Sequence, residues 1–127
     1  MPLATGAAVG GGGRPVICLD SDGSSMYTLQ ALWTQAREGL DVTTIVFSNA
    51  SYAILNLELS RVGASGGPRA LDMFDLTNPR LDFVALAGGL GVAARRATTG
   101  EEMTDALRWA LDEPGPHLID AVVPRVG

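Results

Sequence analysis

Two short apolar runs at the spacing of a β–α–β unit constrain the fold of this 127-residue chain most strongly. They span residues 16–19 and 42–47, are rich in β-branched side chains and end at turn formers, as buried parallel strands do. Residues 25–39, between the runs, have the apolar spacing of a connecting helix. Because parallel strands point the same way, the carboxyl ends of both strands should meet at one edge of the sheet.

Polar residues follow both predicted strands at that edge. Asp22 and Gly23 follow the first run, and Asn49 follows the second, 27 positions later (49 − 22 = 27). Magnesium prefers carboxylate and amide oxygens, and a glycine beside a helix N-terminus lets backbone N–H groups approach a phosphate. The pattern therefore predicts a magnesium-bound diphosphate at this edge. Asp-Gly and Asn are also common as plain turn residues at strand ends, and that interpretation stays open.

The rest of the chain alternates helical and strand patterns. Helices are expected at residues 1–10, 52–62 and 80–90 and from Thr99 onward, with strands at 92–97 and 117–123. The helix predicted at residues 25–39 has an apolar face of Leu29, Leu32, Trp33 and Ala36. The helix from Thr99 onward has an apolar face of Met103, Ala106, Leu107, Ala110 and Leu111. Alternation of this kind predicts one α/β domain, a three-layer αβα arrangement around a mainly parallel sheet.

Composition limits the classes of partner and compartment. The chain carries a net charge of −5 with nine dispersed arginines and no lysine, which argues against binding to nucleic acid or an anionic membrane. No apolar run approaches the roughly 18 to 20 residues that span a bilayer. A single cysteine, Cys18, excludes an internal disulfide framework. The N-terminus lacks the basic region of a signal peptide, so a cytoplasmic location is expected.

Several polar residues outside the predicted site are expected to have structural roles. Residues 10–13 form a four-glycine connector, and His117, which opens the last strand, is expected to be structural or to face solvent. Arg95 and Arg96 should form a solvated pair. Asp20 is expected to cap a turn or meet solvent. It lies two residues before Asp22, and because residues i and i+2 of a strand face the same side, it could also add charge near the metal.

The motifs at the two loops resemble those of thiamine diphosphate enzymes. Asp22-Gly23-Ser24, the following helix and the Asn49 loop ending at Tyr52 are similar to the family pattern Gly-Asp-Gly-Ser, about two dozen residues, then Asn-Asn. Residues 81–87, 99–102 and 115–119 agree with it too. The similarity is to the cofactor diphosphate-binding domain of the acetolactate synthase and benzoylformate decarboxylase group. It covers nearly all of residues 1–127, which implies one N-terminally truncated domain of a larger enzyme.

This resemblance implies a role for each matched position. Magnesium would be bound by one side-chain carboxylate, one side-chain amide oxygen and one backbone carbonyl, those of Asp22, Asn49 and Ser51 respectively. The cofactor itself would be contacted by Gly23, Ser24, Ser25 and Tyr52. Two positions depart from the pattern, since Ser21 replaces its first glycine and Ser48 its first asparagine. If the first position requires a positive φ, a serine there strains the backbone by ~1 kcal/mol or more.

The resemblance also implies partners. The glutamate that activates the cofactor belongs to another domain in this family, so the chain would need a pyrimidine-binding domain or subunit and would be inactive alone. Homo-oligomers would form through the helix near Trp33 and the segment 52–62. The implied function is magnesium-dependent binding of thiamine diphosphate in an enzyme acting on 2-oxo acids. Two alternatives are a truncated interaction module that has lost the cofactor and a general α/β binder of nucleotide phosphates.

Overall fold

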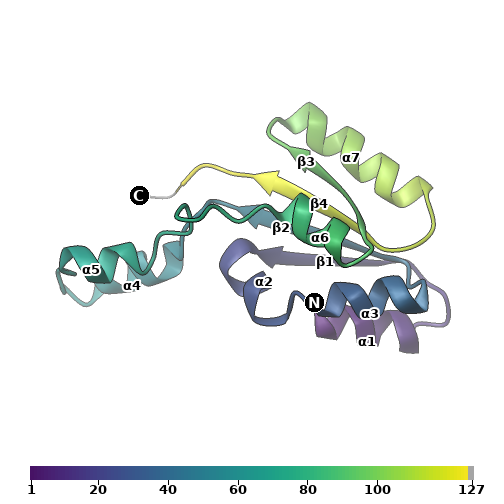
Figure 1. Cartoon of the computed structure of the whole chain (residues 1–127), viewed down its shortest axis with the longest axis horizontal. Coiled ribbons are helices and arrows are strands. Elements are labelled where there is room, and N and C mark those ends of the chain that lie inside the picture. Colours follow the sequence, from purple (N-terminus) through teal and green to yellow (C-terminus); the bar gives the residue numbers. More distant parts are fainter. Residues whose placement is uncertain (126–127) are drawn as a thin grey trace.

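A four-stranded parallel sheet organises the chain in the computed structural model, which describes residues 1–125 (Figure 1). The elements are α1 (Pro2–Gly10), β1 (Val16–Ser21), α2 (Asp22–Thr28), α3 (Ala31–Glu38), β2 (Val42–Ser48), α4 (Ala53–Arg61), α5 (Pro68–Asp72), α6 (Phe83–Gly89), β3 (Ala93–Ala97), α7 (Gly100–Asp112) and β4 (His117–Val122). The strand order is β1-β2-β4-β3, and every pair in the sheet is parallel. The predicted α/β class and parallel sheet are confirmed.

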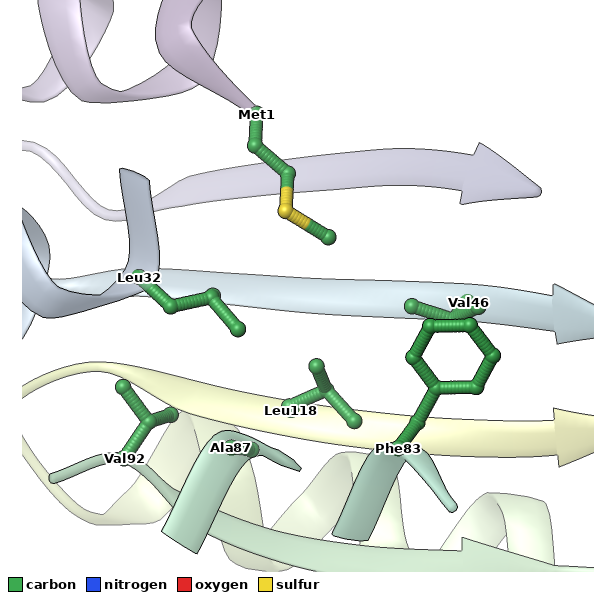
Figure 2. Packing of buried hydrophobic residues seen from close by; sticks show 7 residues of the cluster. All are labelled: Met1, Leu32, Val46, Phe83, Ala87, Val92 and Leu118. Atoms are coloured by element: carbon green, nitrogen blue, oxygen red, sulfur yellow. The ribbon is translucent and has the colours of Figure 1, made fainter. Parts of the chain in front are cut away.

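Helices pack on both faces of the sheet and bury two apolar clusters. Helices α1, α3 and α6 contribute to the larger cluster, which contains Met1, Leu32, Val46, Phe83, Ala87, Val92 and Leu118 (Figure 2). Helix α7 packs on β3 and β4 from the opposite face, where the second cluster contains Ile45, Ala97, Ala106, Ala110, Ile119 and Ala121. The two clusters on opposite faces confirm the predicted three layers.

The helix predicted at 25–39 is two helices, and it starts earlier than expected. Helix α2 begins at Asp22, directly after β1, because the carboxylate of Asp22 accepts the next backbone N–H, that of Gly23, at 2.8 Å. The chain then tightens between α2 and α3, where the N–H of Leu32 bonds to the carbonyl of Leu29 three residues back at 3.0 Å. The fixed start of α2 and this tight turn together divide the predicted helix.

Two side chains predicted on buried helix faces are exposed instead. Trp33 is 52% exposed, and the guanidinium of Arg37 lies 5.5 Å from its ring centre. Leu111 is 51% exposed, although its neighbour Ala110 in α7 is fully buried. The buried residues of α3 are Leu32 and Gln35, and the side-chain amide of Gln35 donates to the Thr5 hydroxyl at 3.0 Å. A polar contact between α1 and α3 thus replaces the expected packing of Trp33.

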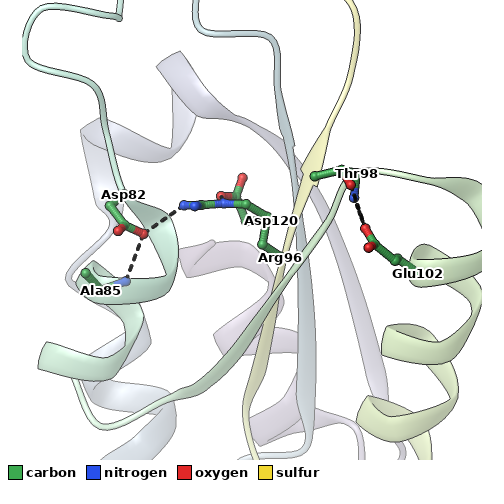
Figure 3. Close-up of polar contacts among 6 residues, drawn as sticks. All are labelled: Asp82, Ala85, Arg96, Thr98, Glu102 and Asp120. Atoms are coloured by element: carbon green, nitrogen blue, oxygen red, sulfur yellow. Dashed lines mark hydrogen bonds and ion pairs between the residues drawn. The ribbon is translucent and has the colours of Figure 1, made fainter.

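The prediction for residues 80–90 places the start of α6 too early. Asp82 is the N-cap, and its carboxylate accepts the N–H of Ala85 at 3.2 Å, so α6 starts at Phe83. Asp82 also receives a charge-assisted hydrogen bond from Arg96 at 2.9 Å, while Arg96 Nε donates to the buried Asp120 at 2.8 Å (Figure 3). Asp120 raises the pKa of Arg96, and the N–H of Ala85, then Arg96, lower the pKa of Asp82.

Arg95 and Arg96 are both exposed, as expected of a solvated pair, but each also makes a contact that the sequence did not indicate. Arg96 ties the start of α6 to β4, and the guanidinium of Arg95 lies 4.1 Å from the ring centre of Trp109. His117 is buried with its ring edge-on to Trp109 at 4.6 Å, which agrees with the expected structural role. These contacts connect strands β3 and β4 to helices α6 and α7, which cover them.

Helices α4 and α5 stand away from the sheet at one end of the molecule (Figure 1). No residue within Ala53–Arg61 or Pro68–Asp72 is buried. Large apolar side chains are exposed on and beside them, namely Ile54, Leu55, Leu57, Val62, Leu71 and Met73. We call α4 and α5 together the arm. Across residues 1–125, no helix has the length and apolar character needed to cross a membrane.

Candidate functional site

A cleft of about 230 Å³ opens where β1 and β2 end. The two strands are adjacent and parallel, with Ser21 level with Phe47, so the loops that follow them meet at one edge, as predicted. The cleft brings together six of the seven predicted site residues: Asp22, Gly23, Ser24, Asn49, Ser51 and Tyr52. Ser21, Ala53 and Ile54 complete its lining. The seventh, Ser25, is fully buried in α2 and does not line the cleft.

Asp22 joins the two loops of the cleft. One carboxylate oxygen accepts the N–H of Gly23 at 2.8 Å, and the other accepts the N–H of Ala50 at 2.7 Å. Asp22 is only 2% exposed, so these bonds fix the position of a nearly buried carboxylate. Each oxygen still has a free lone pair after one hydrogen bond, and Asp22 can therefore also ligate a cation.

The conformation of the Asn49 loop is fixed by a hydrogen bond within the loop and by hydrogen bonds to residues 74–76. The Asn49 side-chain oxygen accepts the N–H of Ser51 at 2.9 Å, and Ala50 between them has a φ of +56°. Residues 74–76 run alongside, where Tyr52 donates to the carbonyl of Phe74 at 2.8 Å and Leu76 donates to that of Ala50 at 3.0 Å. Because the neighbouring residues 50 and 52 make those bonds, the peptide groups of Ser51 point away from residues 74–76.

The segment that supports the loop was missed by the sequence interpretation. Ser51 pairs with Asp75 as an isolated antiparallel bridge, and Asp75 also accepts hydrogen bonds from Thr77 and Arg125. Thr77, then Arg125, lower the pKa of Asp75. Arg125 donates to the Ala50 carbonyl as well, at 3.2 Å. Single bridges between distant loops have no periodic signal in a sequence, so this support could not be expected from the sequence.

Gly23 is the position in α2 where the cleft has no room for a side chain. A Cβ atom there would lie 2.4 Å from Cε1 of the Tyr52 ring, far inside van der Waals contact. The ring of Tyr52 therefore covers the backbone of Gly23. A glycine at this point gives the Tyr52 ring room to lie against the start of α2.

The two serines that depart from the family pattern, Ser21 and Ser48, are both accommodated at the ends of their strands, and the backbone of Ser21 is unstrained. Ser21 has φ −111° and ψ 159°, an extended conformation that any residue adopts, so the strain expected from a positive φ is absent there. Its hydroxyl donates to the hydroxyl of Ser24 at 3.0 Å. Ser48 is the nearly buried last residue of β2, and its carbonyl accepts the N–H of Val123 at 3.0 Å. Asp20 bonds to the neighbouring Ser21 N–H and does not line the cleft.

The donor set of the cleft fits magnesium bound to a diphosphate. Asp22, Asn49 and Ser51 offer a carboxylate, an amide oxygen and a backbone carbonyl, all hard oxygen ligands. Magnesium commonly uses one or two carboxylates and completes its shell with phosphate oxygens and water. Within residues 1–125 no group of three or more His, Cys, Asp or Glu side chains could hold a metal, so a magnesium ion here would rely on phosphate oxygens and water for its remaining ligands.

Known proteins resemble this chain over nearly its whole length. The family described as "Thiamine pyrophosphate enzyme, C-terminal TPP binding domain" matches residues 1–121. The chain is 60% identical to IlvX of Mycobacterium tuberculosis H37Rv, assigned as an acetolactate synthase large subunit, over 99% of this chain and 25% of that protein. It is 36% identical to benzoylformate decarboxylase of Pseudomonas aeruginosa, over 94% of this chain and 22% of that protein.

Solved structures show the same domain. The thiamine diphosphate-dependent 4-hydroxybenzoylformate decarboxylase of Rhodococcus jostii RHA1 superposes with a TM-score of 0.88 at 33% identity, over 98% of this chain and 22% of that one. The chain thus spans a quarter or less of the length of these relatives. By sequence and fold, the chain belongs to the family of C-terminal TPP-binding domains of thiamine pyrophosphate enzymes.

Proposed function

We propose that the cleft at the ends of β1 and β2 binds the diphosphate of thiamine diphosphate through Mg²⁺. The domain would do so within an enzyme of the acetolactate synthase or 2-oxo acid decarboxylase type. The observation that carries this proposal is the convergence of Asp22, Asn49 and Ser51 on one cleft in a chain of the TPP-binding family. The decarboxylases named above are 33% and 36% identical to this chain over the matched region.

Each residue of the cleft has a distinct task in this proposal. Asp22 supplies the negative charge and, with Asn49 and the Ser51 carbonyl, the protein ligands of the ion. Ser24 offers its backbone N–H and its hydroxyl to the phosphate oxygens, and Gly23 beside it keeps this part of the cleft free of a side chain. Tyr52 covers Gly23 and limits the access of water to the phosphates. The bound cofactor supplies a carbanion-stabilising centre, which requires a second domain for its pyrimidine ring.

The partner in this proposal is a pyrimidine-binding domain that docks on the arm beside the cleft. Ile54, which lines the cleft, is 61% exposed, and Leu57 is 60% exposed one helical turn further along α4. Met73, which follows α5, is 75% exposed. Apolar side chains gathered in this way on a projecting surface favour burial against another protein surface. Burial of the arm between subunits would make the enzyme a homo-oligomer.

Titration calorimetry with thiamine diphosphate and MgCl₂ tests the proposal. It should be run on the chain alone and on a chimera in which the chain replaces the matching segment of the M. tuberculosis relative. We expect binding that EDTA abolishes and that Asp22→Ala weakens at least tenfold. Asp20→Ala removes the same charge from the same strand end outside the cleft, and it should leave affinity unchanged. No binding in either setting, or binding insensitive to Asp22→Ala, would contradict the proposal.

A further inference from the structure

The hydroxyl groups of Ser21 and Ser24 form a pair in the lining of the cleft. The Ser21 hydroxyl donates to that of Ser24 at 3.0 Å, and both residues line the cleft together with Asp22 and Asn49. Ser21 departs from the family pattern, which has glycine at this position. The pair is therefore a feature of this chain, and the proposed contacts to the cofactor do not use the Ser21 hydroxyl.

The hydrogen bond between the two serines contributes little to the fold. A serine directly before a helix commonly accepts a backbone N–H of the first turn, but the Ser21 side chain makes no such bond to α2. Ser21 and Ser24 are both exposed, so water could replace their mutual hydrogen bond at little cost in stability. The geometry of the pair therefore matters for what the cleft binds more than for how the chain folds.

The direction of this hydrogen bond determines which proton is left for a ligand. A hydroxyl has one proton and two acceptor lone pairs. The Ser21 proton lies in the bond to Ser24, so the Ser24 proton is the one that can be donated to another group. Within residues 1–125 the Ser24 hydroxyl has no second protein partner. A hydroxyl that accepts a hydrogen bond also becomes a stronger donor, because hydrogen bonds in a chain polarise one another.

We propose that Ser21 is a positioning residue for the cofactor diphosphate, which holds the Ser24 hydroxyl so that its proton is directed to a phosphate oxygen. This inference rests on the proposed function. Phosphate oxygens are strong hydrogen-bond acceptors, so they match the one donor that the pair leaves free. Without Ser21, the Ser24 side chain can rotate among its staggered positions, and binding would have to fix it. Ser21 therefore raises the affinity for phosphate and leaves the stability of the protein nearly unchanged.

Titration calorimetry tests the proposal, with inorganic diphosphate and MgCl₂ on the chain alone and with thiamine diphosphate and MgCl₂ on the chimera. Ser21→Ala should weaken binding about fivefold, the effect of one lost hydrogen bond. Ser21→Thr keeps the hydroxyl on an extended backbone and should restore the affinity. Ser65→Ala removes an exposed hydroxyl outside the cleft and should leave the affinity unchanged. Ser21→Gly, which matches the family pattern, should lose as much as Ser21→Ala, and tighter binding by the glycine variant would overturn the proposal.

A double-mutant cycle shows whether Ser21 acts through Ser24. In a Ser24→Ala background, Ser21→Ala should have no further effect on affinity, because the hydroxyl that Ser21 orients is gone. Additive losses of affinity would overturn the proposal, since Ser21 would then act independently of Ser24. The Tm of the ligand-free Ser21→Ala variant should equal that of the unsubstituted protein, and a lower Tm would also overturn it by indicating a structural role.

The same titrations separate this inference from the proposed function. If the unsubstituted chain and the chimera bind neither diphosphate nor thiamine diphosphate, both proposals fail. If Asp22→Ala weakens binding and Ser21→Ala does not, the cleft binds the cofactor and only the role of Ser21 is refuted.

Discussion

The carboxylate of Asp22 accepts the backbone N–H of Ala50, 28 positions further along the chain, at 2.7 Å. This bond closes the edge formed by β1 and β2, because each residue follows the end of one of these strands. A nearly buried carboxylate that accepts two backbone N–H groups is held in one orientation. The candidate metal ligand is therefore also a structural link between the two loops, and its substitution has two separable effects.

Asp22→Asn should destabilise the fold even without cofactor. An asparagine keeps one acceptor but turns an NH₂ group toward one of the two N–H donors, which leaves a buried donor without a partner. The expected loss in free energy of unfolding is about 1–3 kcal/mol. Urea denaturation measures it, with Asp20→Asn as the control, since Asp20 accepts the exposed Ser21 N–H and pairs with the Met1 amino group at 3.6 Å but does not link the two loops. Equal losses in both variants would show that the bond to Ala50 adds nothing.

Ala50 should tolerate glycine better than any β-branched residue. A φ of +56° strains an alanine by roughly 1–2 kcal/mol. Glycine has no such strain, but it lowers stability by roughly 0.4–1 kcal/mol because it raises the conformational entropy of the unfolded chain. Ala50→Gly should therefore be neutral or stabilising by up to about 1 kcal/mol. Ala50→Val should lose about 1–2 kcal/mol, as expected of a β-branched side chain at positive φ. Thermal unfolding of the two variants gives the order, and a more stable valine variant would contradict it.

Gly23→Ala should destabilise the protein by displacing Tyr52. The new methyl group would lie 2.4 Å from the ring, so the ring has to move, and overpacking of this kind costs about 1–3 kcal/mol. Tyr52→Ala removes the obstacle, and the double variant should lose less than the sum of the two single losses. A double-mutant cycle in urea measures this coupling. If the losses in free energy of unfolding are additive, the contact between Gly23 and Tyr52 is not the cause of the destabilisation.

The parts of the fold with a periodic signal were predictable from the sequence. The apolar runs of β1 and β2 predicted two parallel strands and the shared edge at which the cleft residues lie. The acidic start of α7 predicted where that helix begins. Contacts between single residues far apart in the chain gave no such signal. Arg96 and Asp120 are 24 positions apart, and Arg96 was expected in solvent because nothing in two adjacent arginines reveals a buried carboxylate on the next strand.

The interaction of Arg96 with Asp120 should matter far more than its interaction with Asp82. Arg96→Met leaves the Asp120 side chain, 3% exposed, as a buried charge without its cation. Such losses reach 3–5 kcal/mol for fully buried pairs; because Arg96 is 42% exposed, about 2 kcal/mol is expected. Asp82→Asn keeps an N-cap and removes only an exposed ion pair, so its loss should be much smaller. Chemical denaturation compares the two, and the reverse order would contradict this assignment.

Stability should fall between about pH 5 and pH 3, and Glu102 should contribute to that fall. The Thr98 hydroxyl and N–H donate to one Glu102 oxygen at 2.7 and 2.6 Å (Figure 3), and they lower the pKa of Glu102 from its usual 4.5. A folded-state pKa below the unfolded one adds stability above the unfolded value, and this is lost as pH falls through the folded value. The Glu102→Gln variant should therefore show a weaker dependence of Tm on pH in this window than the unsubstituted protein. Glu101→Gln, in the same helical turn, is the control, and an equal flattening in both variants would contradict the role of Thr98.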